Sequence, residues 1–306
     1  MASPPRIHVL TGPTAVGKTE WALAWAERYD AEIVSCDSLL VYRGMDIGTA
    51  KPSPAEQARI PHHLIDVVGV NERYDVQRFV REARVAVEGI LARGRAVLVA
   101  GGSGFYLRCF FAPVSDGLAV DDTLRAELNA RLEREGLAAL VTELRGLNPG
   151  GLGSLDVCNP RRVLRALERC RASGRTLAEV AADFRSKPAP FSDCEVRCVR
   201  LDRSPVDLDT RIAARVRAMV AAGLVAEVRR LQAAGLDGNP SAARAIGYRE
   251  TLDHLAGRIR EAELESLIVR NTRALVKKQR TWFRTQLPEH RVVDAAGADD
   301  PAALFA

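Results

Sequence analysis

The stretch Gly12-Pro13-Thr14-Ala15-Val16-Gly17-Lys18-Thr19 matches the phosphate-binding pattern G-x-x-x-x-G-K-[ST], and it directly follows the apolar run Ile7 to Leu10. In this pattern the glycines let successive backbone N–H groups converge on phosphate oxygens, the lysine adds a positive charge, and the threonine can hold Mg²⁺. A helical pattern follows at once, so the positive end of a helix dipole also faces the phosphate. The sequence therefore predicts a strand, a phosphate loop and a helix in this order.

Strand and helix patterns alternate through the first third of the chain. Strands are predicted at 31–36 and 96–100, and between them a helix at 74–93, which Gly94 closes. A further strand is predicted at 195–201. This order is typical of an α/β protein whose parallel sheet is flanked by helices, as in the P-loop NTPases.

The strand signal disappears from 121 to 185, where helical patterns are separated by joints rich in glycine and proline. We therefore expect a P-loop core with C-terminal basic helices over 1–115 and 193–289. A small all-helical insertion domain is expected over 116–192. The segment 290–306 is predicted to be a weakly specified tail.

Composition narrows the class of protein. The 306 residues include 44 Lys and Arg, 39 Asp and Glu, and six cysteines. The cysteines form no C-x-x-C pair and have no ligand spacing to histidine, so we expect packed, reduced thiols. The sequence has neither a signal-peptide core nor an apolar stretch long enough for a membrane span, which predicts a soluble, cytoplasmic protein without membrane contact.

A basic segment lies between Ser266 and Pro288, where six basic residues occur without a single acid. Five of the six follow the steps of one helix face, and apolar residues fall on another face. The five are Arg270, Arg273, Lys277, Arg280 and Arg284. A solvated helix face normally mixes Glu and Asp among its basic residues, so this pattern favours an anionic partner.

Asp37 directly follows the predicted strand 31–36, at the edge where open α/β sheets bind ligands. A carboxylate there can accept a proton from an attacking nucleophile. Asp-Ser is also a common turn or helix-capping pair, and position alone supports both interpretations equally. The loop 41–52 has neither a helical nor a strand period, and its polar groups are typical of a binding loop.

The strand at 96–100 ends in Gly101-Gly102-Ser103-Gly104, where many nucleotide hydrolases carry an Asp that organises metal and water. No acid stands there. The glycines admit close backbone approach to a ligand, and Ser103 can donate to phosphate, whereas the alternative is a plain tight turn. The incomplete hydrolysis apparatus favours a phosphate-bearing leaving group over a phosphoryl donor.

Together these motifs resemble the tRNA dimethylallyltransferases, also called tRNA isopentenyltransferases. The motifs follow the family's order and include Gly12 to Thr19, Asp37-Ser38, Val41 to Pro52, Pro61 to Asp66, Gly101 to Tyr106, Ala245 to Arg249 and Lys278 to Arg284. Leu40 stands where the family often has Gln, which puts one tRNA contact in doubt. Ser103 replaces a usual Thr and keeps the hydroxyl.

The resemblance implies transfer of a dimethylallyl group from dimethylallyl diphosphate to the exocyclic amine of the adenosine 3′ of the anticodon in tRNA, with release of diphosphate. By similarity, Asp37 accepts the amine proton, while Lys18, Ser103 and Arg215 complete the catalytic set. Thr19 is implied to hold Mg²⁺. The residues implied to bind diphosphate are Gly12, Pro13, Thr14, Ala15, Val16, Gly17, Lys18, Thr19, Arg211 and Arg215. From spacing alone, the last two are equally well interpreted as surface arginines on one helix face.

The same resemblance implies a set of residues that contact tRNA. They are Asp37, Ser38, Leu39, Leu40, Ser103, Arg125, Arg161, Arg162, Arg165, Arg244, Gly247, Tyr248, Arg249, Lys277, Lys278, Gln279, Arg280, Trp282 and Arg284. In the helical insertion, Arg161, Arg165 and Arg169 share one face, as a clamp on an RNA stem requires. The target base must leave its stack, so we expect a pocket for a flipped adenine. We expect the chain to act as a monomer.

Two other classes of protein share part of this pattern. A small-molecule kinase would bind ATP on the same loop and use Asp37 to orient an acceptor hydroxyl. A non-catalytic RNA-binding protein would carry the loop as a relict. The basic segment disfavours the kinase, because a small acceptor needs no such surface. The intact Lys18 and Thr19 disfavour the relict.

Overall fold

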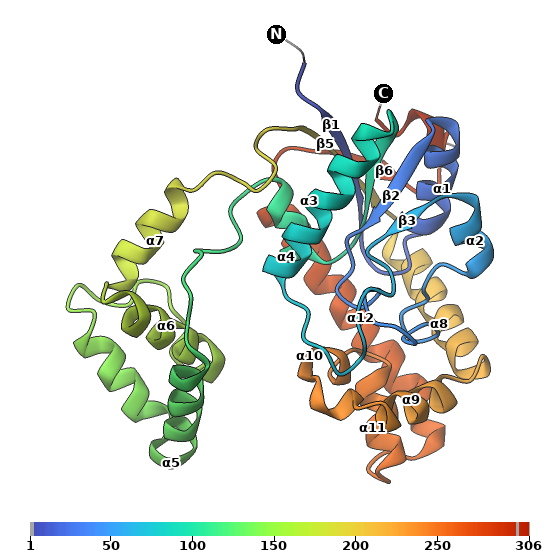
Figure 1. Cartoon of the computed structure of the whole chain (residues 1–306). Coiled ribbons are helices and arrows are strands. Elements are labelled where there is room, and N and C mark those ends of the chain that lie inside the picture. Colours follow the sequence, from blue (N-terminus) through green and yellow to red (C-terminus); the bar gives the residue numbers. More distant parts are fainter. Residues whose placement is uncertain (1–2, 298–299, 306) are drawn as a thin grey trace. The chain divides into compact units, whose positions relative to one another are not determined.

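The computed structural model describes residues 3–297 and 300–305 and divides into two compact units (Figure 1). The larger unit comprises Met1–Ala112 and Pro190–Ala306, and the smaller unit is Pro113–Ala189. The sequence patterns gave 116–192 for the smaller unit. Each unit has its own core and is described by itself.

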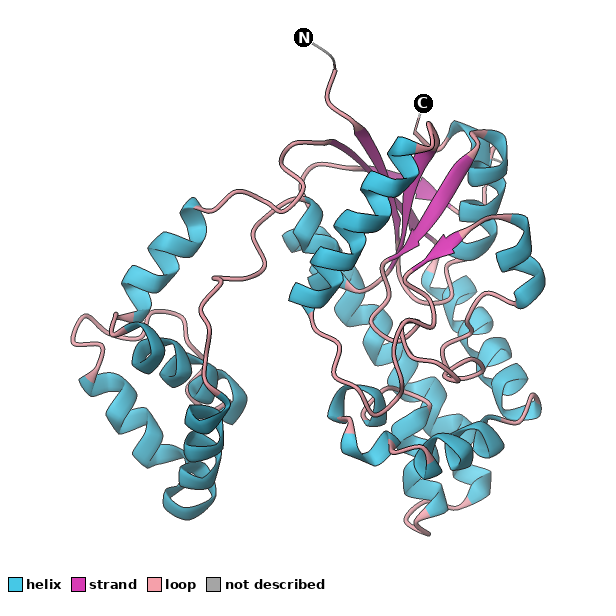
Figure 2. Cartoon of the chain, viewed as in Figure 1, coloured by secondary structure: helices cyan, strands magenta, loops and turns pink. Residues whose placement is uncertain are grey.

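Within the described residues, the larger unit forms a six-stranded parallel sheet with the order β3-β2-β4-β1-β5-β6 (Figure 2). The strands are β1 (Arg6–Thr11), β2 (Ala31–Ser35), β3 (His62–His63), β4 (Ala96–Gly101), β5 (Glu195–Asp202) and β6 (Arg291–Asp294). Helices flank the sheet, as its buried central strands require, because both faces of a parallel sheet are covered. This arrangement confirms the predicted P-loop NTPase-like α/β fold.

Two short strands are missing from the sequence prediction. β3 has too few residues to show any period, and it is defined only by its pairing with Ile33 and Val34 of β2. β6 shows that the prediction of a weakly specified tail at 290–306 is wrong, because β6 pairs with β5 and buries Val293. Further along, Leu304 is buried. Residues 298–299 and 306 of that segment lie outside the described residues.

The helix predicted at 74–93 is observed at 76–92, whereas the short helices at 54–59 and 104–107 were not predicted. The helices of the larger unit are α1 (Lys18–Arg28), α2 (Pro54–Arg59), α3 (Val76–Ala92), α4 (Gly104–Leu107), α8 (Pro205–Ala221), α9 (Leu224–Ala233), α10 (Pro240–Ala243), α11 (Tyr248–Leu255) and α12 (Glu261–Gln286), with short 3₁₀ turns η1 (Arg108–Phe110), η2 (Leu236–Gly238) and η3 (Pro301–Ala303). The Asp75 side chain caps α3 by accepting from the Arg78 N–H. Among the described residues, no helix combines the length and the apolar character that crossing a membrane requires.

The smaller unit consists of α5 (Asp122–Gly146), α6 (Pro160–Ser173) and α7 (Leu177–Ser186). Gly136 breaks α5 with a φ of 77°, a conformation that glycine adopts without strain. Leu128, Leu140 and Leu144 of α5 pack against Leu167 of α6 in a small apolar core. Asn159 caps α6, and a capping box begins α7. The helical prediction for 121–185 is therefore confirmed.

Candidate active site

The loop between β1 and α1 has the backbone shape of a phosphate-binding loop. Gly12, Ala15 and Gly17 all have positive φ, at 153°, 67° and 102°. A Cβ on Gly12 would lie 2.6 Å from the carbonyl oxygen of Leu201, so only glycine fits there. Gly17 is the N-cap of α1, and no side chain caps that helix, which leaves its N-terminal N–H groups to an anion.

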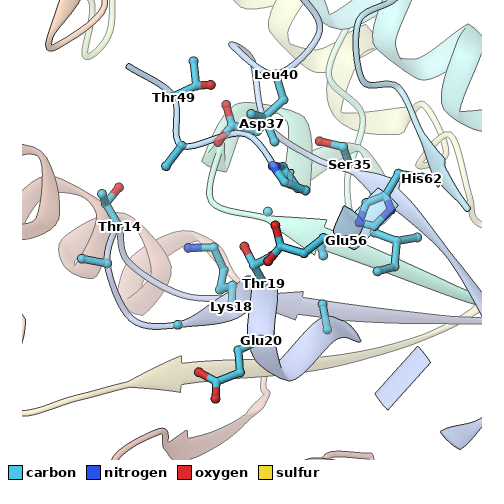
Figure 3. A pocket seen from close by; sticks show the side chains of 18 of the residues that line it. Thr14, Lys18, Thr19, Glu20, Ser35, Asp37, Leu40, Thr49, Glu56 and His62 are labelled. Carbon is cyan, nitrogen blue, oxygen red and sulfur yellow. The ribbon is translucent and has the colours of Figure 1, made fainter. Parts of the chain in front are cut away.

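A first cavity of about 510 Å³ opens over this loop (Figure 3). Three segments that are far apart in the sequence line it: the phosphate loop with Lys18 and Thr19, the end of β2 with Asp37, and α8 with Arg211 and Arg215. The structure therefore brings Asp37 together with seven of the ten residues predicted to bind diphosphate. Gly12, Pro13 and Val16 do not line this cavity.

The Lys18 ammonium is held by its own loop. Its Nζ atom donates to the carbonyl oxygens of Gly12 and Pro13, both at 2.9 Å. Burial, and to a smaller extent the nearby charge of Arg215, lower the pKa of Lys18 to about 8, although Asp37 acts in the opposite direction. An arriving diphosphate would replace these carbonyls with a stronger acceptor and favour the charged form of the lysine.

Both predicted arginines of α8 are fixed to backbone rather than free on the surface. The Nη2 atom of Arg215 donates to the Thr49 carbonyl at 2.9 Å, and the Nε atom of Arg211 donates to the Ala15 carbonyl at 2.8 Å. Burial lowers the pKa of Arg215, and Asp37 partly offsets this effect. The surface-arginine interpretation is therefore wrong for this pair.

Arg203 is a site residue that sequence reasoning missed. It follows the end of β5, and its Nε atom donates to the Val16 carbonyl at 2.8 Å while its Nη1 atom pairs with Asp207 at 2.8 Å. Together with Arg211, it holds two consecutive carbonyls of the phosphate loop. The only sequence signal is an arginine after a strand, and its meaning depends on β5 pairing with β1.

Asp37 forms the turn that its position suggested, and its role as a proton acceptor stays a prediction. One carboxylate oxygen, Oδ1, accepts from the Leu39 N–H at 2.9 Å, which is the turn expected of an Asp-Ser pair. The residue also lines the first cavity and a second one. The turn fixes the carboxylate in place at the junction of the two cavities.

The second cavity measures about 690 Å³ and shares Thr14, Asp37, Thr49 and Arg215 with the first. Eight of the residues expected to contact tRNA line it: Asp37, Ser38, Leu39, Ser103, Arg244, Lys278, Gln279 and Trp282. Leu40 lines the first cavity instead. The mixture of aromatic, apolar and basic side chains in the second cavity suits a base attached to a phosphate backbone.

The glycines at the end of β4 pack closely against other parts of the protein, and they also line the two cavities. A Cβ on Gly101 would lie 2.1 Å from the Cys36 carbonyl oxygen, and one on Gly104 would lie 2.5 Å from the Trp282 ring. Close packing therefore requires glycine at these two positions, and the expected close approach of a ligand stays a prediction. The Ser103 hydroxyl accepts from the Ser38 N–H at 2.9 Å and ties the ends of β2 and β4 together.

Gln279 connects α12 to the phosphate loop. Its Oε1 atom accepts from the Thr14 N–H at 2.9 Å, and its Nε2 atom donates to the Gly102 carbonyl at 3.2 Å. The side chain thus joins the two loops that follow β1 and β4. A residue expected to contact tRNA therefore also fixes the backbone of the phosphate site.

Neighbouring elements supply acids to the basic face of α12. Arg273 pairs with Asp209 at 3.2 Å, and Arg280 pairs with Asp202 at 2.8 Å. Arg280 also donates to the Arg203 carbonyl at 3.1 Å. The face is acid-free in sequence but not in space, whereas Lys277 and Arg284, both expected to contact tRNA, remain exposed.

The structure does not support the predicted tRNA contact of Tyr248. Its side chain is fully buried, and its hydroxyl donates to Glu227 at 2.7 Å, so the expected side-chain contact with tRNA does not fit this structure. The neighbouring Arg249 pairs with the buried Glu250, which also accepts from the Gly247 N–H at 2.7 Å. In sequence, a tyrosine beside an arginine gives no sign of which of the two is buried.

In the smaller unit, the expected tRNA residues differ in their freedom. Arg165 pairs with Glu168 at 2.8 Å, and Arg125 pairs with Asp122 at 3.0 Å. Arg161 and Arg162 are exposed, and within the described part of the chain neither has a salt bridge. Arg169, on the face expected to clamp RNA, is tied to Asp116.

A magnesium ion would depend on substrate oxygens here. Within residues 3–297 and 300–305, no three His, Cys, Asp or Glu side chains gather into a metal-binding cluster. Thr19 and Asp37 line the first cavity (Figure 3). Mg²⁺ prefers a few protein oxygens together with phosphate and water, so a site built around Thr19 fits this ion.

The sequence model of the IPP transferase family matches residues 40–286 of this chain. The chain belongs to the IPP transferase family. A relative from Opitutus terrae named tRNA dimethylallyltransferase is 63% identical over 301 residues, which cover 98% of this chain and 97% of the relative. A relative of the same name from Deinococcus radiodurans is 42% identical, covering 96% of this chain and 95% of its own length.

Solved structures show the same fold in other IPP transferases. The full-length tRNA isopentenylpyrophosphate transferase from Bacillus halodurans superposes with a TM-score of 0.67 at 32% identity, covering 96% of this chain and 90% of that one. A eukaryotic dimethylallyltransferase described as acting on tRNA gives a TM-score of 0.78 at 25% identity, covering 95% and 74%. This IPP transferase is therefore an enzyme of the transferase class.

Proposed function

We propose that this chain transfers a dimethylallyl group from dimethylallyl diphosphate to the exocyclic amine of the adenosine 3′ of the anticodon in tRNA. Membership of the family supports the transfer to tRNA. The donor and the position of the adenosine are our inference. One observation supports the proposal above all: Asp37 and Arg215 line both cavities, so two different substrates can meet beside them.

The first cavity suits the donor. The free N–H groups at the start of α1, together with Lys18, Arg211 and Arg215, provide a concentrated positive field for a diphosphate. Thr19 would hold Mg²⁺, which supplies further positive charge to the leaving oxygens when bound. The apolar side chains of Ile33 and Leu40 line the same cavity and suit a hydrocarbon tail.

The second cavity suits a base that has left its stack. In the reaction, the adenine nitrogen forms a bond to C1 of the dimethylallyl group, and the bond from C1 to the diphosphate oxygen breaks. Asp37 accepts the proton that the nitrogen loses, and the electron pair of the broken bond leaves with diphosphate. Because an aromatic amine is a weak nucleophile, alignment and stabilisation of the leaving group by Lys18 and Arg215 lower the barrier most.

The kinase interpretation lacks support in this site. No acid stands at the end of β4 to organise metal and water for triphosphate chemistry, since that position is Gly101-Gly102. The second cavity is lined by Arg244 and Lys278, which a small hydroxyl acceptor would not need. One chain also supplies both cavities, which is consistent with the expected monomer.

A direct assay tests the proposal. The protein is incubated with unmodified tRNA, Mg²⁺ and dimethylallyl diphosphate labelled in the hydrocarbon, and the RNA is then isolated. We expect label at the adenosine 3′ of the anticodon and one diphosphate released per label. Label elsewhere in the tRNA would refute the position. Absence of label, together with transfer of a terminal phosphate from ATP to a hydroxyl compound, would refute the whole proposal.

A further inference from the structure

A buried carboxylate organises the loop 41–52. Glu227 of α9 is only 1% exposed. Its Oε2 atom accepts from the N–H groups of Asp46 at 3.1 Å and Ile47 at 2.7 Å, and its Oε1 atom accepts from the Gly48 N–H at 3.1 Å. Three successive backbone donors thus converge on one side chain.

Tyr248 completes this arrangement. Its hydroxyl donates to Oε1 of Glu227 at 2.7 Å, and its ring packs on Gly48, where a Cβ would lie only 2.5 Å from the ring. None of the salt bridges among the described residues includes Glu227, so its charge depends on these four hydrogen bonds. A buried carboxylate without them is costly, and the loop backbone is therefore firmly defined.

The next residue, Thr49, links this fixed backbone to the active site. Thr49 directly follows the three N–H groups, and its carbonyl oxygen accepts from Nη2 of Arg215 at 2.9 Å. Thr49 and Arg215 line both cavities. Arg215 makes no salt bridge within the described residues, so this carbonyl is the partner that orients its guanidinium group.

We propose that Glu227 and Tyr248 are positioning residues for the leaving group. They hold the backbone at 46–48, which places the Thr49 carbonyl, and that carbonyl aims Arg215 at the diphosphate. This inference rests on the proposed function, because it assigns diphosphate to the first cavity. It also gives Tyr248 a role different from the tRNA contact that its motif implied.

Binding of pyrophosphate with Mg²⁺ tests this role without any transfer reaction. Calorimetry measures the dissociation constant for the wild type, Tyr248→Phe, Glu227→Gln and Arg215→Ala. We expect about fivefold weaker binding for Tyr248→Phe, which loses one hydrogen bond, and about tenfold or more for Glu227→Gln, whose amide opposes a backbone N–H. The tRNA affinity of Tyr248→Phe should stay within about twofold of wild type.

Double variants separate positioning from general destabilisation. If Glu227 and Tyr248 act through Arg215, adding either substitution to Arg215→Ala should weaken pyrophosphate binding no further. A matched control is Glu32→Gln, which removes another buried carboxylate, held by Arg93 and His63 near the start of β2. We expect Glu32→Gln to lower the unfolding temperature without changing pyrophosphate affinity.

Three outcomes would overturn the inference. The first is equal weakening with and without Arg215, and the second is weakening in Glu32→Gln of the same size. The third is a loss of tRNA affinity in Tyr248→Phe with pyrophosphate binding intact. Should Glu227→Gln fail to fold, Tyr248→Phe still decides the question. A wild type that binds no pyrophosphate would instead refute the proposed function and this inference with it.

Discussion

The basic side chains at the phosphate site and those on α6 of the smaller unit are held in opposite ways. At the phosphate site, Lys18, Arg211 and Arg215 each donate to a backbone carbonyl. On α6, Arg161 and Arg162 are exposed, with no salt bridge in the described part of the chain. The first set has one geometry before any ligand arrives, whereas the second can follow the surface of a partner.

This difference fits two kinds of anion. A leaving diphosphate gains most from charges that need no reorganisation at the moment of bond breaking, so fixed cations suit catalysis. A nucleic-acid backbone carries many similar phosphates, and cations that displace its counterions contribute affinity without strict geometry. The comparison therefore predicts that substitutions at the two places affect different measurements.

The largest effect is expected at Asp37. Asp37→Asn keeps an oxygen for the turn to Leu39 but removes the proton acceptor, so kcat should fall by roughly 10²- to 10⁴-fold. The tRNA dissociation constant should stay within about twofold. Steady-state kinetics and a filter-binding assay check both quantities. A large loss of tRNA affinity with most of the turnover retained would show that Asp37 belongs to tRNA recognition.

The double variant Arg161→Ala/Arg162→Ala tests the exposed arginines of α6. It should weaken tRNA binding on the order of thirtyfold at low salt and reduce the slope of log affinity against log salt by about two. Pyrophosphate affinity should not change. The control is Arg171→Ala, because Arg171 is already paired with Glu127 and Glu143. Equal salt slopes for the double variant and wild type would contradict the predicted role.

The lowered pKa of Lys18 predicts that diphosphate binding at the phosphate site depends on pH. Above pH 8 the empty site loses the Lys18 proton, so pyrophosphate must bind together with a proton, and its association constant should fall by up to about tenfold per pH unit. Calorimetry in buffers of different ionisation enthalpy measures that proton uptake. Lys18→Arg stays charged and should lack this component. The same proton uptake in Lys18→Arg would assign it to another group.

The smallest effect is expected for Gln279, which bonds to the phosphate loop and also lines the second cavity. Gln279→Leu removes the hydrogen bonds to Thr14 and Gly102, so the KM for dimethylallyl diphosphate should rise about fivefold. The tRNA dissociation constant should change less than that KM. Measuring both constants shows whether Gln279 acts mainly on diphosphate binding or on tRNA binding. A larger change for tRNA would show that Gln279 acts mainly in tRNA recognition.

Much of the fold followed from local patterns. Mostly apolar runs predicted β1, β2 and β4, and alternation predicted β5, because buried parallel strands are rich in apolar residues. β3 and β6 were not predicted, because such short strands at the two ends of the sheet are defined only by pairing with a neighbouring strand. For the site, the motif around Lys18 and the position of Asp37 were sufficient to predict a shared cavity.

The sequence by itself determined the phosphate loop, its chemistry and the family, because these depend on residue types at fixed local spacing. Only the tertiary structure shows that Arg203 binds the phosphate loop and that Tyr248 is buried against Glu227. It also shows that Asp202 pairs with a basic residue of α12. Each of those partners is distant in sequence. The partner of a side chain depends on which elements pack together, and local sequence patterns do not predict that packing.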